Sequence, residues 1–200
     1  LDSLTNLVVE YNQFNDVHTT WGTVVDINTT DVVTGLVLSP NWWDKVSGPV
    51  PGPDWDNHYD IYVNAGPVAS SLYAPWCGEP GCTTLINPPV HNITQDRLYL
   101  TIQAAIDDVS TVDGDTITVA AGTYVEQVTI TKDITLLGAG KDVTTIQAFS
   151  SMPICFTTVK DHRPVVCVKD ANATIDGFSI DGLGLGNTNV NFEGVAFRNA

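Results

Sequence analysis

Residues 99–148 read YLTIQAAIDDVSTVDGDTITVAAGTYVEQVTITKDITLLGAGKDVTTIQA. After an amphipathic segment come short, closely spaced strands, in which Val, Ile, Leu and Thr recur and Gly and Asp mark the corners. This spacing excludes βαβ units, whose crossovers need about a dozen residues or more. The signals for two-residue turns fall mostly at strand edges, which disfavours hairpins. We therefore predict an all-β fold, a right-handed parallel β-helix with inward-facing apolar residues.

A short amphipathic helix is expected at about 98–110, ahead of these strands. Its apolar face has the spacing of a helix, and it consists of Leu98, Ile102, Ala105, Ile106 and Val109. Gln103, Asp107 and Asp108 would point outward. Because one face is apolar and must cover something, we expect this helix to cap the open end of the coil.

Several segments of the chain resemble the pectin-lyase-like β-helix superfamily. TIQAAIDD (101–108), GDTITVAAGTYVEQVTI (114–130) and ITLLGAG (134–140) are similar to its amino-terminal portion, most closely in the NosD-like and pectin-methylesterase-like branches. ATIDGFSIDG (173–182) resembles the coil that follows. NWWDKVSGPVPGP (41–53) with YAPW (73–76) resembles the closing segment of NosD-like repeats. The resemblance implies the fold, but it specifies no activity.

The order of these segments places a closing segment before a starting one. We expect residues 1–82 to form the final coils and closing segment of one β-helix unit. Residues 83–97, rich in Pro, Thr and Asn, would be a linker. Residues 98–200 would then hold the capping helix and the first coils of the next unit.

Joining the carboxy terminus to a second copy of the amino terminus reads as continuous β-helix sequence. Phe178 and Ile180 are then followed about 29 residues later by Leu7 and Val9, and Leu7 by Leu36 after another 29. Val195 similarly leads to Val24. The chain would be a tandem repeat, a subunit that stacks on copies of itself, or a compact monomer with residues 83–97 running back along the coil. The expected assembly edges are Leu7, Val8, Val9, Val195 and Phe197.

Four cysteines fall into two local pairs, each around a short polar turn. We predict disulfides between Cys77 and Cys82 and between Cys155 and Cys167. Zinc sites are a weaker alternative, since no CxxC spacing is present, and free thiols remain open. Disulfides indicate an extracellular or cell-surface location, which three sequons also favour, at Asn28, Asn92 and Asn172.

Charge and hydropathy exclude two kinds of partner. The net charge of −15, with eight Lys and Arg against 23 Asp and Glu, opposes binding to a phosphate backbone. No apolar run is long enough to insert into a membrane. We therefore expect neither a nucleic-acid partner nor membrane insertion.

No catalytic set is recognisable in the sequence. Pectin-active relatives use carboxylates with a basic residue, but Asp176 and Asp181 lie in a strand-and-turn coil where an outward Asp is routine. The histidines are scattered over four segments, and no phosphate-binding loop is present. We predict no catalytic residues and no organic cofactor.

One acidic segment and the tryptophans remain as candidate ligand sites. Asp54, Asp56 and Asp60 offer the oxygen ligands that calcium prefers, although a solvated acidic loop is the favoured explanation. Tryptophans stack on sugar rings, but Trp42, Trp43 and Trp76 fall in the closing segment, where packing is expected.

We therefore predict an extracellular structural protein that is not an enzyme. Its β-helix units would join end to end with copies of themselves in a surface array or filament. The alternative is a β-helix that binds or acts on polysaccharide.

Overall fold

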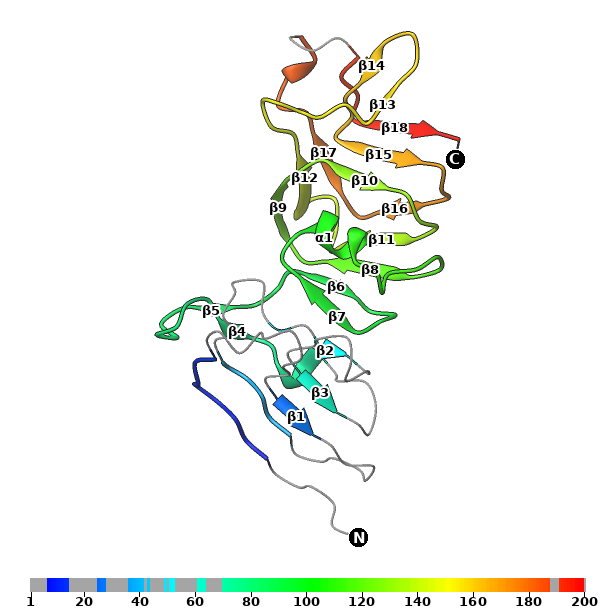
Figure 1. The fold of residues 1–200 in the computed structure, drawn as a ribbon. Helices are drawn as coiled ribbons and strands as arrows, with labels where there is room; N and C mark the ends of the chain where they lie inside the picture. The colour runs from blue at the N-terminus through cyan, green and yellow to red at the C-terminus, as the bar shows by residue number, and fades with distance from the viewer. Residues whose placement is uncertain are drawn as a thin grey trace. The chain divides into compact units, whose positions relative to one another are not determined.

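Most strands in the computed structural model of the protein are short and contain Val, Ile or Thr (Figure 1). The structure describes residues 7–14, 25–27, 36–41, 43, 49, 51–52, 61–63, 70–187 and 191–199. The chain divides into Leu1–Pro88, here called unit 1, and Pro89–Ala200, called unit 2.

Unit 2 contains the strands predicted from residues 99–148 and several more. In chain order its elements are β6 Val90–Asn92, β7 Arg97–Tyr99, α1 Ile102–Asp107, β8 Thr116–Val119, β9 Gly122–Val125, β10 Val128–Ile130, β11 Thr135–Gly138, β12 Thr144–Gln147, β13 Phe156–Thr157, β14 Asp161–His162, β15 Val166–Lys169, β16 Thr174–Asp176, β17 Ser179–Asp181, the 3-10 helix η2 Leu185–Asn187 and β18 Val195–Arg198.

These strands build three sheets with parallel pairing, and the chain visits the sheets in the same order three times. β8, β11 and β16 pair in one sheet, β9, β12 and β17 in the second, and β10, β15 and β18 in the third. Figure 1 shows β10, β15 and β18 lying one above the other. The predicted all-β class with one short helix is confirmed, and its sheets are largely parallel.

The core of unit 2 consists of residues that occupy the same position in successive strands. Leu136 pairs with Ile117, and Ile146 pairs with Tyr124. In the third sheet Ile130 pairs with Val168, and all these side chains are buried. Buried and half-buried side chains alternate along β8, β10 and β12, because successive side chains of a strand point to opposite faces.

Helix α1 is shorter than predicted, because residues at both ends of 98–110 take other roles. Leu98 belongs to β7, and Val109 is 94% exposed. Ile102, Ala105 and Ile106 are buried as expected. The Thr101 hydroxyl caps the helix by accepting a hydrogen bond from the N–H of Ala104 at 3.1 Å.

The helix and the β6–β7 hairpin close the first end of unit 2. The side-chain amide of Gln103 pairs with the backbone of Thr129 on β10, accepting from its N–H at 2.7 Å and donating to its carbonyl at 3.2 Å. β6 pairs antiparallel with β8. Gln103 therefore covers a strand edge, whereas the sequence predicts that it points outward into solvent.

Part of the predicted linker 83–97 is folded structure. The boundary between the units falls at Pro88 and Pro89, and β6 and β7 belong to unit 2. Val90 and Asn92 are completely buried. The linker interpretation is wrong for this part, because its polar residues bind the turn that precedes β8: Asn92 and Gln95 both donate to the Asp115 carboxylate.

Unit 1 is described in part. Its elements are β1 Val25–Ile27, β2 Pro51–Gly52, β3 Ile61–Val63, the 3-10 helix η1 Ser70–Leu72, β4 Trp76–Cys77 and β5 Leu85–Ile86. β1, β3 and β2 form a parallel sheet. Val8 pairs in parallel with Val37, so the expected 29-residue step from residue 7 to 36 is confirmed. Trp43 and Trp76 are buried, as expected for packing residues.

Candidate functional site

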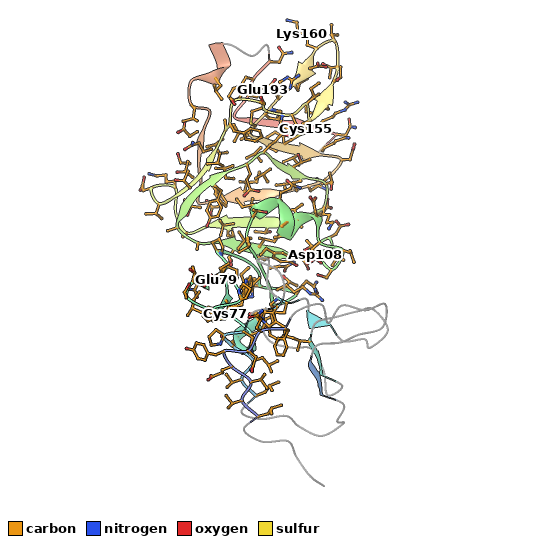
Figure 2. The ribbon with its side chains drawn as sticks, turned by 60° about the vertical axis from the view of Figure 1, so that its left-hand side comes forward. Cys77, Glu79, Asp108, Cys155, Lys160 and Glu193 are labelled. Carbon is orange, nitrogen blue, oxygen red and sulfur yellow. A yellow bond between two sulfur atoms is a disulfide. The ribbon has the colours of Figure 1, made fainter. Side chains whose placement is uncertain are left out.

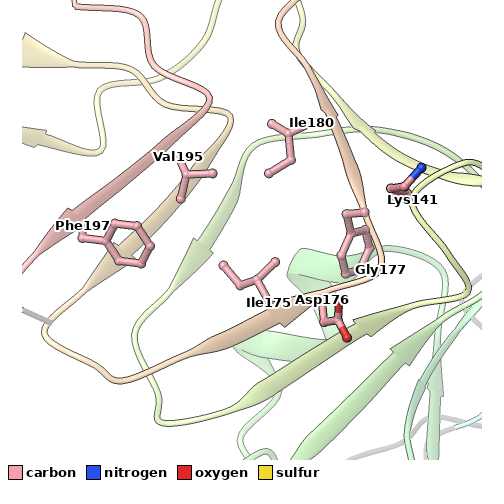
Figure 3. A pocket seen from close by; sticks show the side chains of 8 residues that line it. Lys141, Ile175, Asp176, Gly177, Ile180, Val195 and Phe197 are labelled. Atoms are coloured by element: carbon pink, nitrogen blue, oxygen red, sulfur yellow. The ribbon is translucent and has the colours of Figure 1, made fainter.

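The second end of unit 2, at β16, β17 and β18, is the candidate functional site. A hollow of about 550 Å³ opens there, and Figure 3 shows its lining. Most of its lining is apolar, and it consists of Ile175, Phe178, Ile180, Val195 and Phe197, with Lys141, Asp176 and Gly177 beside them.

These apolar residues continue the stacks that form the core. Phe197 pairs with Val168, yet Phe197 is 62% exposed and Val168 is completely buried. Ile180 likewise follows the buried Ile146. Among the described residues nothing covers Val195 and Phe197 on the side away from β15. The hollow is thus the uncovered end of the core, called here the open end.

The charged residues at the open end do not form a catalytic pair. The Lys141 ammonium lies 2.7 Å from the exposed Asp142 carboxylate, and no hydrogen bond joins it to Asp176 among the described contacts. The side chain of Asp181 is exposed and accepts the N–H of Leu183 at 2.8 Å. An apolar lining with unpaired strand edges is suited to binding another strand.

The predicted assembly edges are described at both ends of the chain. In unit 2, Val195 and Phe197 line the open end. In unit 1, Leu7 and Val9 are half-buried, while Val8 between them is 55% exposed. The Val9 N–H donates to the Val37 carbonyl, and the Val37 N–H donates to the Leu7 carbonyl, each at 2.8 Å. One edge of this segment is therefore paired.

A disulfide-bonded excursion lies beside β15 and β18. Cys155 and Cys167 are bonded, with their Cα atoms 6.5 Å apart, and the chain between them forms the β13–β14 hairpin (Figure 2). His162 stacks on Phe156, and its Nδ1 lies 2.7 Å from the Glu193 carboxylate. These contacts join the hairpin to the segment that leads into β18, and sequence reasoning found none of them.

The other predicted disulfide is also present. Cys77 and Cys82 are bonded in unit 1, with Cα atoms 4.7 Å apart. Within this turn the Glu79 carboxylate accepts hydrogen bonds from the backbone and hydroxyl of Thr83. The Thr83 hydroxyl and the Thr84 N–H lower the pKa of Glu79. Both cysteine pairs are confirmed, and no described cysteine is free.

Two further groups with shifted pKa values, Tyr99 and Asp108, lie next to α1. Burial raises the pKa of Tyr99 to about 12, and the Asp108 carboxylate adds to the increase. Burial alone would raise the pKa of Asp108. Hydrogen bonds from the Ser110 hydroxyl and N–H, at 2.6 and 2.8 Å, outweigh it, so this pKa is lowered. These residues stabilise the loop after α1.

The predicted glycosylation sites have different environments. The Asn92 side chain is buried, and its Nδ2 donates to Thr111 and Asp115 at 3.0 and 2.9 Å. A glycan on this nitrogen has no space in the folded chain, so the prediction at Asn92 is corrected: this residue is structural. Asn172 is exposed. Asn28 lies outside the described residues.

The predicted calcium ligands Asp54, Asp56 and Asp60 lie outside the described residues. Within the described part of the chain, no three His, Cys, Asp or Glu side chains gather to hold a metal ion. The same part contains no helix that is both long and apolar enough to cross a membrane.

Comparison with known proteins gives one informative similarity. The chain is 34% identical over 93 residues to a cell surface glycoprotein of Methanothermus fervidus. The match covers 46% of the chain, which spans only 14% of the length of that glycoprotein. No family model and no solved structure matches the chain.

The two disulfides and this similarity agree on location. Disulfides persist in oxidising compartments outside the cytosol, and the relative is a cell surface protein. The chain is an extracellular or cell-surface protein, as the cysteines predict.

Proposed function

We propose that the chain is a structural component of a cell surface, built from β-helix units that join end to end with copies of themselves. The open end carries this proposal. One end of unit 2 is closed by α1 and β6–β7. At the other end Val195 and Phe197 are exposed, although the residues of β15 with which they pair are completely buried. An uncovered core end of this kind is an interface for another strand.

The proposed architecture of unit 2 is a right-handed parallel β-helix of the pectin-lyase-like type. The repeated visits to three parallel sheets support it, as does the resemblance of residues 101–140. Parallel strands joined by crossovers are almost always right-handed. Solution scattering and a crystal structure of unit 2 test this, and antiparallel or left-handed coils would contradict it.

We propose a non-enzymatic role, with neither cofactor nor nucleic-acid partner. The apolar lining of the open end supports this, since it offers no acid and base placed for proton transfer. Calcium bound by Asp54, Asp56 and Asp60 would be structural in this role. Isothermal titration with calcium, using the Asp54→Ala and Asp56→Ala variants as controls, tests that site.

Polysaccharide binding is the competing function. Two of the tryptophans that suggested it, Trp43 and Trp76, are buried and cannot stack on sugars. A binding and turnover screen against pectic and other acidic polysaccharides separates the two functions. Turnover that is lost in Asp176→Ala would replace the structural proposal with an enzymatic one.

The structural role is tested on native material and on the purified chain. We expect antibodies to label the cell exterior, and we expect negative-stain electron microscopy of concentrated protein to show linear or layered assemblies. Val195→Lys should reduce assembly, while the exposed Asp142→Asn should not. Well-separated particles of the unaltered chain at high concentration would contradict the proposal.

A surface role also predicts which sequon carries a glycan. Asn172 is exposed on unit 2, whereas Asn92 is buried. Glycopeptide mass spectrometry of the native protein should find the modification at Asn172 and none at Asn92.

A further inference from the structure

We propose that the open end of unit 2 binds residues 7–12 of a second copy of the chain, as a parallel joint in which Ser179 pairs with Val8 and Asp181 with Glu10. The inference rests on the proposed function, because it names the strands and the register of the end-to-end contact. Coil length, apolar packing and the direction of backbone hydrogen bonds each support it independently.

Coil lengths match on the two sides of the proposed joint. In unit 2, Val166 pairs with Val195 and Asp170 binds Asn199, in both cases 29 positions along the chain. In unit 1, Asn12 binds Asn41 across the same 29 positions, next to the Val8–Val37 pair. The β15–β18 step in unit 2 thus equals the step in unit 1, although other coils of unit 2 differ in length, since Thr145 pairs with Ser179 after 34 positions.

The apolar residues of the two edges also match. Phe178 and Ile180 line the open end and need cover. Leu7 and Val9 are likewise two positions apart. In the parallel pairing of Val8 with Val37 they lie beside Leu36 and Leu38, whose side chains are 5% and 0% exposed. Pairing Ser179 with Val8 puts Leu7 over Phe178 and Val9 over Ile180, and so continues the core.

The backbone groups at the two edges point in the directions that this register needs. Successive residues of a strand direct their N–H and C=O groups to opposite edges. The Asp181 carbonyl accepts the Ala148 N–H, so the groups of Ile180 face the open edge. In unit 1, Leu7 and Val9 bond to Val37, so the groups of Val8 face away from it. A shift by one residue would break this agreement and turn the apolar residues outward.

The same register places two carboxylates opposite each other. Asp181 and Glu10 are both exposed, and in the joint they would be direct neighbours on its outer face. Like charges directly opposite in a sheet are unfavourable. The joint should therefore tighten with increasing salt, and it should tighten in Glu10→Gln at low salt.

Cysteine cross-linking between two different chains tests the register. One chain carries Ser179→Cys or Asp181→Cys, and a chain of different mass carries Val8→Cys or Glu10→Cys. The described native cysteines are all paired, so the new thiols are the reactive ones. Directly paired residues of adjacent strands lie within disulfide range, and residues displaced along the strand do not. After mild oxidation, non-reducing electrophoresis measures the heterodimer.

We expect several-fold more heterodimer from the matched pairs, 179 with 8 and 181 with 10, than from the crossed pairs, 179 with 10 and 181 with 8. Val8→Pro, introduced into the chain that carries Glu10→Cys, should abolish its cross-linking with Asp181→Cys. Proline has no backbone N–H, so residue 8 can no longer donate a hydrogen bond across the joint. Equal yields from matched and crossed pairs would overturn the joint. If the chain then still assembles in electron micrographs, the proposed function stands and only the joint fails.

Discussion

Gly138 and Gly177 meet where β11 lies beside the residue that follows β16. Gly138 ends β11, and a Cβ atom there would collide with the backbone carbonyl of Gly177, which itself has a φ of +78°. No rotamer change relieves a clash between a Cβ and a neighbouring backbone. The corner therefore depends on glycine at both positions.

We expect Gly138→Ala to destabilise the chain by about 2–3 kcal/mol, in the range of overpacked cores. Gly186→Ala is the matched control, because a Cβ there meets only Phe192 at 3.7 Å. Denaturant unfolding measures both variants. Equal stability of the two would show that the corner relaxes easily.

Asp133 links two turns of unit 2. Its carboxylate accepts the Asn172 N–H at 2.7 Å and the Asn172 amide at 3.3 Å. These bonds, the backbone one first, lower the pKa of Asp133 below its ordinary value of 3.8. A lowered pKa in the folded state means that the stabilisation is complete above the ordinary value and is lost as pH falls through the folded-state pKa.

Asp133→Asn should therefore lower the melting temperature at neutral pH, and the difference from the parent should shrink in acid, as the pH falls below 3.8 and through the lowered folded-state pKa. Thermal melts across this range measure it. Asp142→Asn serves as control for the removal of an exposed carboxylate. If the melting temperature of Asp133→Asn stays equally far below that of the parent in acid, the negative charge of Asp133 does not provide the stabilisation.

At the scale of elements, α1 depends on a residue far away in sequence. The Glu126 carboxylate accepts the N–H groups of Ile102 and Gln103, at 3.0 and 2.8 Å. These donors have no partner inside the helix. At the other end, the Lys132 ammonium donates to the carbonyls of Ile106 and Asp108.

Glu126→Ala should cost about 1–2 kcal/mol, as for other lost caps. Glu126→Gln keeps an acceptor and should cost less. Urea unfolding compares them, and hydrogen exchange at Ile102 and Gln103 should accelerate in the alanine variant. If the hydrogen-exchange rates of Ile102 and Gln103 do not change in Glu126→Ala, water replaces the carboxylate without a loss of stability.

Local patterns explain which elements were predictable. The alternation of Val, Ile and Thr identifies β8 to β12, and short polar turns identify both disulfides. The hairpin β6–β7 escaped prediction because its stability comes from Asp115, more than 20 residues away from Asn92. Gln103 and Asn92 were mispredicted for the same reason. The neighbouring sequence predicts that each is exposed, but hydrogen bonds to Thr129 and to Asp115, respectively, determine where they lie.

At the scale of the whole chain, charge is divided unevenly between the units. Only Lys45 among the eight basic residues lies in Leu1–Pro88. Unit 2 holds the rest, together with its own core and closed end. It has the features of an independently folding domain.

We expect Pro89–Ala200, expressed alone, to fold cooperatively and to retain the Cys155–Cys167 bond. Circular dichroism and intact mass before and after reduction measure this. A fragment that stays unfolded while the full chain folds would show that unit 2 needs unit 1.

The Cys155–Cys167 bond has a mechanical consequence. A chain pulled from its ends can lengthen only through residues that lie on the shortest covalent path. The bond bypasses the segment between two cysteines that are 12 positions apart, which withholds about 4 nm of extension. Single-molecule stretching should therefore give a longer fully extended unit 2 after reduction, so the redox state of its surroundings would set how far a loaded chain can extend.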